Sequence, residues 1–286
     1  MTRPLVTIAY NAKSGRHSQK RLDMLRASFA KAGYDTELAD SYSADLIPLA
    51  ARSAQLCVVG GDGTLRDVIA RMNGHSNMPP VSIFPAGTIN LVAREVRHPG
   101  RIGKFVRRVL DAEGTPRTHY HGALNDQPML VCASVGPDSL AVAAVSEPLK
   151  RRIGRFAYAA ALAKVMLRWP HHTLTVLADG EAHQCEAVFV LKGRYFAGPW
   201  KISRDADLTQ PKFQLLLLPR ASRRDYVRLM LSAMGFPGAA LKSWLRLTAE
   251  TVEISAAHPL PVQVDGDIVA TLPVKAVIHE QPVRFA

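Results

Sequence analysis

Three short apolar runs in the first third of the chain each end in a loop of small and polar residues. The runs are PLVTIAY, QLCVV and PVSIF, and the loops after them are NAKSGR, GGDGT and PAGTIN at residues 11–16, 60–64 and 85–90. Repeated strands that end in such loops predict a parallel α/β sheet, because the carboxyl ends of parallel strands lie along one edge. The three loops are therefore expected to meet at that edge and to form a binding site.

Helical patterns separate these strands. In SQKRLDMLRASFAKAG the apolar residues Leu22, Leu25 and Phe29 recur at helical spacing, and Gly33 closes the segment. LRDVIARMNG follows the second loop with a similar pattern. Because the alternation of strand and helix ends near residue 117, residues 1–117 are predicted to form one α/β domain.

From residue 118 onward the pattern changes to short apolar or alternating runs split by Asn, Asp, Gly and Pro. HHTLTVLAD, HQCEAVFVLKGRYF and TAETVEISA are examples, and such runs predict antiparallel strands. Two helical inserts are expected, near residues 147–169 and 222–246. Residues 118–286 thus predict a β-rich, sandwich-like second domain, and a return of its last residues to the first domain is left open.

The composition of the three loops favours a phosphate ligand. Glycines let backbone N–H groups approach a phosphate closely, and Ser14, Thr64, Thr88 and Asn90 add neutral donors. A single glycine-rich turn is usually only a tight turn, but three of them at one sheet edge favour a phosphate site. None of the loops fits G-x-x-x-x-G-K-[ST] or G-x-G-x-x-G, so the standard P-loop and dinucleotide folds are disfavoured.

Taken together, GGDGTL, the upstream NAKSGR and the downstream PAGTIN-LVAR resemble the catalytic domain of the diacylglycerol kinase family. That family includes bacterial lipid kinases, sphingosine kinases and ceramide kinases, and it is distantly related to NAD kinase. The resemblance extends over nearly the whole chain, since VDGD at 264–267 resembles the family's DGE motif and SVGPDSLA at 134–141 its glycine–aspartate element. It implies a two-domain fold in which ATP, with Mg²⁺, and a lipid acceptor meet in the cleft between the domains.

The resemblance also implies roles for individual residues. It gives catalytic roles to Asp62, Asp138 and Asp267, and it leaves the metal ligands unknown. The residues that it places around the nucleotide all lie in the three loops, and they are Asn11, Lys13, Ser14, Gly15, Arg16, Gly60, Gly61, Gly63, Thr64, Gly87, Thr88 and Asn90. For Lys13 and Arg16 the alternative interpretation is a solvated loop charge.

Asp62 is the only carboxylate inside the glycine loops. In phosphoryl transfer a carboxylate at this place can accept the proton of the acceptor hydroxyl or hold the hydrated metal ion. The alternative is that Asp62 only forms a turn or caps a helix. If Asp62 has the catalytic role, the substitution Asp62→Asn is expected to abolish turnover and to leave the fold intact.

Several positions depart from the family's pattern. Leu91 stands where the GTxND loop frequently ends in aspartate, Asp267 replaces the glutamate of DGE, and Gln210-Pro211 matches an Asp-Gly pair that supports a structural Mg²⁺. Asp205 and Asp207 are nearby and could substitute. Two alternatives therefore stay open, a NAD kinase-type phosphotransferase and a catalytically impaired nucleotide-binding regulatory protein.

The charge of the chain favours an anionic partner, since 36 Lys and Arg against 24 Asp and Glu give a net charge of +12. LKRRIGRFAYAAALAKVMLRW and RASRRDYVRLMLSAMGF mix basic and apolar residues, so they could lie on an anionic bilayer or pack as helices with solvated basic faces. No run approaches the roughly 20 apolar residues of a membrane span, and no motif of the known nucleic-acid-binding modules is present.

The predicted protein is thus a cytoplasmic, ATP- and Mg²⁺-dependent lipid kinase that acts on a hydroxyl of a membrane lipid such as diacylglycerol. It is expected to touch the inner face of the membrane peripherally and to have no nucleic-acid partner, and a homodimer is left open. Cys57, Cys132 and Cys185 lie in apolar runs and are predicted to be reduced core residues. The pairs His119/His121 and His171/His172 lack partners at zinc-ligand spacing and are predicted to be exposed.

Overall fold

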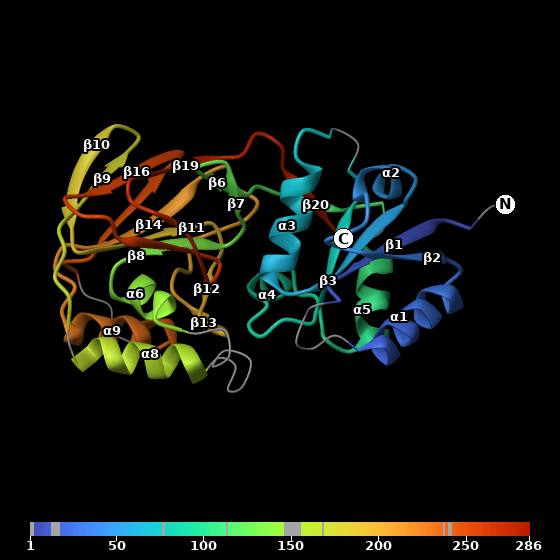
Figure 1. Ribbon diagram of the computed structural model, residues 1–286, viewed down its shortest axis with the longest axis horizontal. Coiled ribbons are helices and arrows are strands. Elements are labelled where there is room, and N and C mark those ends of the chain that lie inside the picture. The colour runs from blue at the N-terminus through green and yellow to red at the C-terminus, as the bar shows by residue number, and fades with distance from the viewer. Residues whose placement is uncertain are drawn as a thin grey trace. The chain divides into compact units, whose positions relative to one another are not determined.

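The computed structural model describes residues 3–12, 18–75, 78–112, 114–145, 156–167, 169–236, 238–239 and 242–286 of the chain. The chain divides into two compact units (Figure 1). The first unit consists of Met1–Tyr120 together with Glu280–Ala286, and the second consists of His121–His279. The sequence pattern places the boundary at residues 117–118.

In the described part of the first unit, six strands form one sheet in the order β2-β1-β3-β4-β20-β5. Their bounds are β1 Leu5–Tyr10, β2 Asp35–Asp40, β3 Gln55–Gly60, β4 Val81–Pro85, β5 Arg117–His119 and β20 Val283–Phe285. Strands β1 to β4 run parallel, β20 is parallel to β4, and β5 is antiparallel to β20. The predicted parallel sheet is confirmed, and β1, β3 and β4 end side by side at its carboxyl edge.

Helices connect these strands and cover the sheet. They are α1 Gln19–Lys31, α2 Leu46–Ala51, α3 Asp62–Met72, α4 Leu91–Glu95 and α5 Ile102–Asp111. Helix α1 begins after Ser18, whose hydroxyl accepts the N–H of Arg21, and its buried face includes Leu22 and Phe29. Helix α1 contacts α5, and α2 contacts α3. Figure 1 shows these two pairs on opposite sides of the sheet, as right-handed crossovers require.

The end of the chain belongs to the first unit. The N–H of Ala286 donates to the carbonyl of Val81, and the Ala286 carbonyl accepts Nε2 of His98 at 2.6 Å. Since the N–H of Ile83 donates to Nδ1 of His98, the His98 proton is on Nε2. Burial lowers the pKa of His98 to about 4, so the ring is neutral at pH 7. The neutral imidazole therefore fixes strand β20 beside β4.

The second unit contains two antiparallel sheets and a short hairpin. Within the described residues, one sheet has the order β10-β9-β16-β19-β6-β7, the other the order β15-β14-β11-β8-β17-β18, and β12 pairs with β13. The bounds are β6 Gly122–Leu124, β7 Gln127–Met129, β8 Cys132–Val135, β9 Leu174–Ala178, β10 Glu181–Cys185, β11 Ala187–Leu191, β12 Tyr195–Phe196, β13 Trp200–Lys201, β14 Phe213–Leu218, β15 Leu245–Ala249, β16 Thr251–Ala256, β17 Pro261–Val264, β18 Asp267–Thr271 and β19 Val274–Ile278. This arrangement confirms the predicted sandwich.

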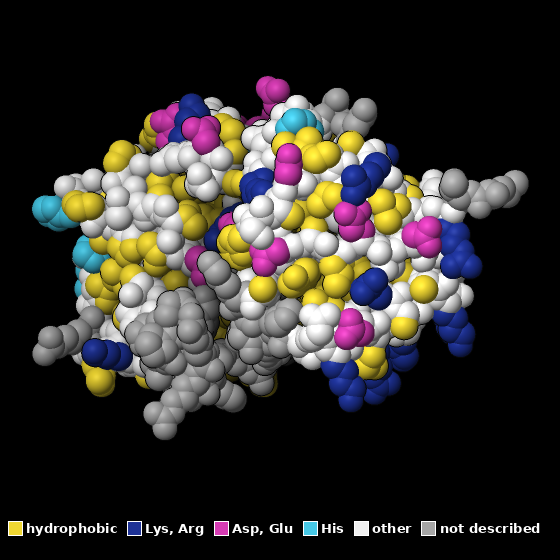
Figure 2. All heavy atoms as spheres, turned by 45° about the vertical axis from the view of Figure 1, so that its right-hand side comes forward, with side chains coloured by type: hydrophobic (Ala, Val, Ile, Leu, Met, Phe, Trp, Pro, Cys, Tyr) yellow, Lys and Arg dark blue, Asp and Glu magenta, His cyan; other side chains and the backbone are white. Residues whose placement is uncertain are grey.

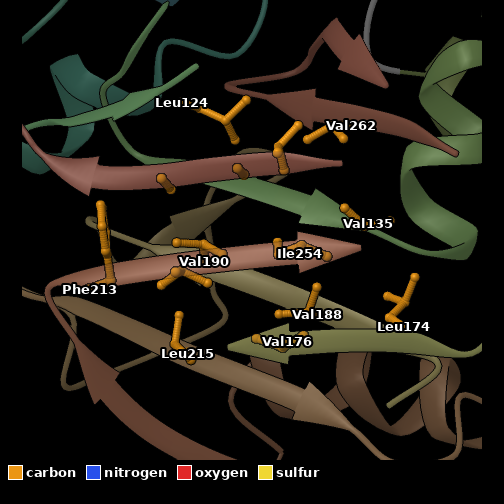
Figure 3. Packing of buried hydrophobic residues seen from close by; sticks show 14 of the residues in the cluster. Leu124, Val135, Leu174, Val176, Val188, Val190, Phe213, Leu215, Ile254 and Val262 are labelled. Atoms are coloured by element: carbon orange, nitrogen blue, oxygen red, sulfur yellow. The ribbon is translucent and has the colours of Figure 1, made fainter. Parts of the chain in front are cut away.

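The core of the second unit lies between its two sheets. Figure 3 shows Val176 and Ile254 of one sheet beside Val188, Val190 and Phe213 of the other. Strands β9 and β16 alternate buried with partly exposed residues, as strands with one inward face do. Each fully buried Val, Leu, Ile or Phe side chain contributes about 1.5 to 3 kcal/mol, so this interface stabilises the unit.

Helices of the second unit are α6 Pro137–Ala143, α8 Phe156–Leu167 and α9 Arg223–Ala233. The predicted insert at 147–169 is confirmed only over α8, because residues 146–155 and 168 lie outside the described part. The prediction of a helix over residues 222–246 is wrong beyond Ala233. Helix α9 ends there because Gly235 has a positive φ of 95°, and β15 begins at Leu245.

The cysteine prediction is confirmed, since Cys57, Cys132 and Cys185 are buried and form no disulfide. The histidine prediction is partly wrong. His121 is 5% exposed, and its ring stacks on that of His279 with centroids 4.6 Å apart.

Candidate functional site

Two of the glycine loops of the first unit are in direct contact. A Cβ placed on Gly87 would lie 2.5 Å from the Cα of Gly61, and a Cβ on Gly61 would lie 3.1 Å from the Cα of Gly87. Any side chain at Gly87 would therefore push the loops apart. The contact explains the two glycines, because only they let the second and third loops approach at backbone distance.

The first loop joins the second through side chains. The amide of Asn11 donates to the hydroxyl of Thr64 at 3.2 Å. A Cβ on Gly60 would lie 2.6 Å from the Cβ of Thr64, so the Thr64 side chain occupies the space that glycine leaves. Lys13, Ser14, Gly15 and Arg16 lie outside the described residues. The structure thus brings Asn11, Gly60 and Thr64 together, as expected for one site.

Asn90 closes the third loop. Its backbone is left-handed, with φ 56° and ψ 60°. Its amide oxygen accepts the N–H of Gly87 at 2.8 Å, and its amide nitrogen donates to the Gly87 carbonyl at 2.9 Å. Asparagine tolerates this conformation better than most residues and can bond both groups at once. Asn90 therefore shapes the loop that contacts Gly61, and Thr88 of the same loop is exposed.

Asp62 fixes the second loop to the start of α4. Its side chain is almost buried, with 7% of the residue exposed. One carboxylate oxygen accepts the N–H of Leu91 at 2.8 Å, and the other accepts the N–H of Val92 at 2.9 Å. Asp62 therefore caps a helix, as the alternative interpretation predicts. The capped helix is α4 and not α3, the helix that begins at Asp62.

This geometry revises the expectation for Asp62→Asn. An asparagine has only one acceptor oxygen, so it can satisfy one of the two N–H groups and turns an NH₂ toward the other. The substitution will disturb the loop as well as remove the charge. Leu91 contributes its N–H to the carboxylate, while its side chain is buried with 3% exposed. The position that is often an aspartate in the family therefore serves packing in this chain.

Helix α3 gives the loop a positive electrostatic end. It begins at Asp62, and its N-cap is Gly61, which provides no side-chain hydrogen bond. The first N–H groups of any helix lack intrahelical partners, and the helix dipole places a partial positive charge there. Together with the Thr64 hydroxyl, these groups fit the oxygens of a phosphate. Gly63 lies in this first turn.

In the second unit, the VDGD segment forms a tight hairpin turn. Val264 pairs with Asp267, and the two residues between them have positive φ, 51° for Asp265 and 97° for Gly266. An Asp-Gly pair is a typical two-residue hairpin turn. Asp267 begins β18 and is partly exposed.

Asp265 is the residue that the sequence analysis missed. Its carboxylate accepts the N–H groups of Leu130, Val131 and Cys132 at 2.8, 2.8 and 3.0 Å. The residue is 7% exposed, like Asp62. The Asp-Gly dipeptide in the sequence signals the turn, but nothing local signals the partners more than 130 residues away. Asp265 therefore anchors the turn that presents Asp267.

Asp138 lies at the start of α6 and is buried. Its carboxylate accepts the hydroxyl of Tyr226 at 3.1 Å and that of Ser134. Burial raises the pKa of the Asp138 carboxyl, and these two hydrogen bonds oppose the rise.

A chain of hydrogen bonds links Asp138 to the hairpin turn. Gln263 donates from its amide to the Ser134 hydroxyl at 2.9 Å, and its amide oxygen accepts the N–H of Gly266 at 2.7 Å. The network thus runs from Asp138 to the backbone of Gly266, the residue before Asp267, and the catalytic roles of Asp138 and Asp267 stay predictions.

The segment around Gln210-Pro211, where the resemblance implies a structural Mg²⁺, surrounds the ammonium of Lys192. Nζ of Lys192 donates to the main-chain carbonyls of Asp207 at 3.4 Å, Lys212 at 3.0 Å and Gln210. The Asp207 carboxylate accepts both donors of Thr209 at 2.9 Å. Over the described ranges, no three His, Cys, Asp or Glu side chains gather as a metal site would require. The carbonyl oxygens that bind the Lys192 ammonium cannot also serve as ligands of a structural Mg²⁺.

Comparison with known proteins adds family and fold. The chain matches the diacylglycerol kinase catalytic domain over residues 5–119 and the YegS C-terminal NAD kinase beta sandwich-like domain over residues 131–285. A relative named diacylglycerol kinase from Staphylococcus carnosus is 27% identical over 275 residues, which cover 93% of this chain and 89% of that protein.

Two solved structures share the fold. A diacylglycerol kinase from Bacillus anthracis has a TM-score of 0.71 at 14% identity, with 96% of this chain and 93% of that chain covered. An NAD kinase from Archaeoglobus fulgidus in complex with ATP has a TM-score of 0.55 at 14% identity, with 98% and 92% covered. At these identities the likeness concerns the fold alone.

Proposed function

Because the chain belongs to the diacylglycerol kinase catalytic-domain family, with the YegS-type C-terminal domain, we propose that it is an ATP- and Mg²⁺-dependent lipid kinase. The reaction would transfer the γ-phosphoryl group of ATP to a hydroxyl of a membrane lipid such as diacylglycerol. The observation that carries this proposal is the meeting of the three loops of the first unit. Asn11 bonds Thr64, Gly61 touches Gly87, and Asp62 bonds the backbone of Leu91.

The loops would bind the phosphates of ATP. Phosphoryl transfer depends mainly on alignment and on neutralisation of charge, and oriented backbone donors supply both. The first turn of α3, which follows Gly61, would direct its backbone N–H groups at phosphate oxygens. The described loop residues are neutral except for Asp62, so we propose that Mg²⁺ arrives with ATP as part of the substrate and neutralises most of its charge.

Asp62 would act on the acceptor hydroxyl or on the hydrated Mg²⁺. Two backbone N–H groups orient its carboxylate, and each oxygen of a carboxylate has a second lone pair. A carboxylate held in this way can accept a proton without reorganising during the reaction. In the second unit, we propose that Asp267 contributes a further carboxylate and that Asp138 and Asp265 position the hairpin turn that carries it.

A lipid acceptor requires contact with a membrane, and α9 has a suitable surface. The α9 patch consists of exposed apolar side chains on α9, just after its end and at the end of α8, namely Leu167, Val227, Leu231, Met234 and Phe236. Arg223, Arg224 and Arg228 are exposed on the same helix. Apolar residues flanked by arginines suit an anionic bilayer surface. Among the described helices, none is long and apolar enough to cross a membrane.

The first unit adds a second basic surface. Figure 2 shows Lys and Arg side chains gathered along its right and lower right edge. Helices α1 and α5 of this unit carry exposed basic residues, namely Lys20, Arg26, Lys31, Lys104 and Arg107. Such a surface would increase the attraction to anionic lipids. Residues 146–155, which contain more of the basic residues in the sequence, lie outside the described part.

Two alternatives have specific support. Gln210 and the buried Leu91 stand at positions that carry carboxylates in the family's pattern, and the Lys192 ammonium donates to the Gln210 carbonyl, which favours a nucleotide-binding protein with impaired catalysis. The fold shared with an NAD kinase favours NAD as the acceptor.

One assay separates the three functions. Purified protein is incubated with labelled ATP, Mg²⁺ and either a total lipid extract or NAD, and labelled products are identified by mass. A phosphorylated lipid supports the proposal, and phosphorylated NAD supports the NAD kinase type. ATP binding without either product indicates the impaired protein.

A further inference from the structure

Lys192 is one of the most buried side chains of the second unit. It follows the last residue of β11, and 0% of it is exposed. Its ammonium is surrounded by the carbonyl cage, which we define as the main-chain carbonyls of Asp207, Gln210 and Lys212. An ammonium has three donors, so the cage can satisfy the group completely.

The chemistry of the carbonyl cage is that of a site for a hard cation. Backbone carbonyl oxygens from one loop, with a carboxylate nearby, are the usual ligands of Ca²⁺ and other hard ions. Buried carbonyls also need partners, because an unpaired one costs about 1 to 3 kcal/mol. We propose that Lys192 is the built-in cation of the second unit, which fills the carbonyl cage and takes the place of a structural divalent metal ion.

The carbonyl cage is connected to the hairpin turn of Asp265. The N–H groups of Lys192 and Gly193 donate to the carbonyl of Val131 at 2.8 and 2.9 Å. The N–H of Val131 in turn donates to the Asp265 carboxylate. Lys192 thus lies between the loop at 207–212 and the turn that presents Asp267, so it is a positioning residue for both.

Lys192 keeps its charge at pH 7. Burial lowers its pKa to about 8, and the nearby Asp207 carboxylate opposes the shift. His121 also faces this region, but burial lowers its pKa to about 3, so the ring is neutral. The ammonium is therefore the cation available to the carbonyl cage at pH 7.

The first test uses the wild-type protein without nucleotide. Its thermal unfolding midpoint is measured after chelation and again with millimolar Mg²⁺ or Ca²⁺. We expect the midpoint to shift by less than about 1 °C. A structural ion bound at 100 times its Kd would raise the midpoint by at least about 5 °C, and a rise of that size would overturn the proposal.

The second test empties the carbonyl cage. Lys192→Ala should unfold several degrees below the wild type, and methylammonium should recover part of the loss because it can enter the space and donate to the carbonyls. Tetramethylammonium, which has no N–H, should recover nothing. Lys192→Met, which fills the space without donors, should be destabilised and should not respond to methylammonium. Lys201→Ala is the control and should behave like the wild type, because Lys201 of β13 is exposed and its ammonium contacts only the face of the Tyr195 ring among the interactions described.

Several results would contradict the proposal. A Lys192→Met variant with the wild-type midpoint would show that the ammonium is dispensable. An equal response of Lys192→Ala to both ammonium salts would show that the carbonyl cage does not select a donor. These measurements follow unfolding and do not depend on the proposed function, so a failure here is distinct from an absence of lipid kinase activity. If Lys192→Ala does not fold, the wild-type metal test still decides.

Discussion

The loops of the two units differ in what their backbones present. In the first unit, the glycine loops and the start of α3 present N–H donors, and the Asp62 carboxylate accepts the N–H groups of Leu91 and Val92 at the start of α4. In the second unit, the loop at 207–212 presents carbonyl acceptors, and the chain fills them with its own Lys192. We propose that the first arrangement binds a ligand from outside, whereas the second is filled by a side chain of the protein itself.

The comparison also separates two fixed carboxylates. Asp62 accepts two backbone N–H groups at the start of a helix, and Asp265 accepts three beside a hairpin turn. Both are 7% exposed. Burial alone does not distinguish the two carboxylates. We expect substitution to show that Asp62 serves the reaction and that Asp265 serves the structure.

The largest effect is expected at Asp62. Asp62→Asn should lower lipid phosphorylation at least about 100-fold, because it removes the charge that accepts a proton or orients Mg²⁺. It should also lower the free energy of unfolding by about 1 to 3 kcal/mol, since one backbone N–H loses its partner. Turnover and urea unfolding of the variant are measured together.

Asp265→Asn is the matched control. It should destabilise the second unit by at least as much as Asp62→Asn destabilises the first, because three N–H groups share its carboxylate, and it should leave the affinity for ATP within about twofold of wild type. An Asp62→Asn variant that retains more than about a tenth of the wild-type rate would remove Asp62 from the chemistry.

The next effect concerns pH and Lys192. The pKa of Lys192 is about 8 in the folded protein and 10.5 for an ordinary lysine, so between these values the unfolded chain binds more protons. The cost of burying the charge is fully present below pH 8, is relieved as pH rises toward 10.5, and is absent above it. Relative to Lys192→Met, the wild type should therefore gain about 2 to 3 kcal/mol of unfolding free energy between pH 8 and pH 10.

Denaturant unfolding of both proteins at the two pH values checks this prediction. Burial lowers the pKa of His121 to about 3, so its ring stays neutral over this range, and the difference between the two proteins isolates Lys192. A difference that is constant with pH, or that shrinks as pH rises, would contradict the buried ammonium.

A smaller effect is expected at the contact of the two glycine loops. In Gly87→Ala the new Cβ would lie 2.5 Å from the Cα of Gly61, so the loops must separate. We expect about tenfold weaker ATP binding, because overpacking typically costs 1 to 3 kcal/mol. Gly103→Ala in α5 is the control, since a Cβ there meets nothing within 4 Å. Unchanged affinity in Gly87→Ala would show that the loop contact does not shape the nucleotide site.

The smallest effect is expected on the α9 patch. Arg224→Ala and Arg228→Ala should each weaken binding to anionic vesicles by about 1 kcal/mol, and the loss should disappear at high salt. Arg52→Ala, which removes an exposed arginine paired with Glu37 in the first unit, should have less effect. Sedimentation with vesicles of increasing anionic content measures the binding, and equal binding to neutral vesicles would remove the electrostatic basis of the patch.

The sequence predicted those features that depend on local pattern. The strands before the three loops, the helix that carries Leu22 and Phe29, and the sandwich all follow from periodicity and from glycine loops. It did not predict partners distant in the chain. Asp62 bonds Val92, 30 residues away, and Asp265 bonds Leu130, 135 residues away.

Lys192 shows the same limit. In the sequence it is a single lysine after an apolar run, and such a residue is usually solvated at the end of a strand. Its burial cannot be predicted from the sequence, because the carbonyls of residues 207–212 surround its ammonium only in the folded structure. The prediction of a helix over 222–246 was too long, and Gly235 indicates the correct end in the sequence, because a glycine with positive φ is a typical end of a helix.

The most direct test of the account is an equilibrium titration of the wild-type protein with ATP and with adenosine, each in the presence of Mg²⁺. If the loops of the first unit bind phosphate through backbone donors, ATP should bind at one site and at least about tenfold more tightly than adenosine, because each charge-assisted hydrogen bond adds about 1.5 to 3 kcal/mol. Adenosine binding as tight as that of ATP, or no binding of ATP, would contradict the central claim that the first unit is built to hold a phosphate.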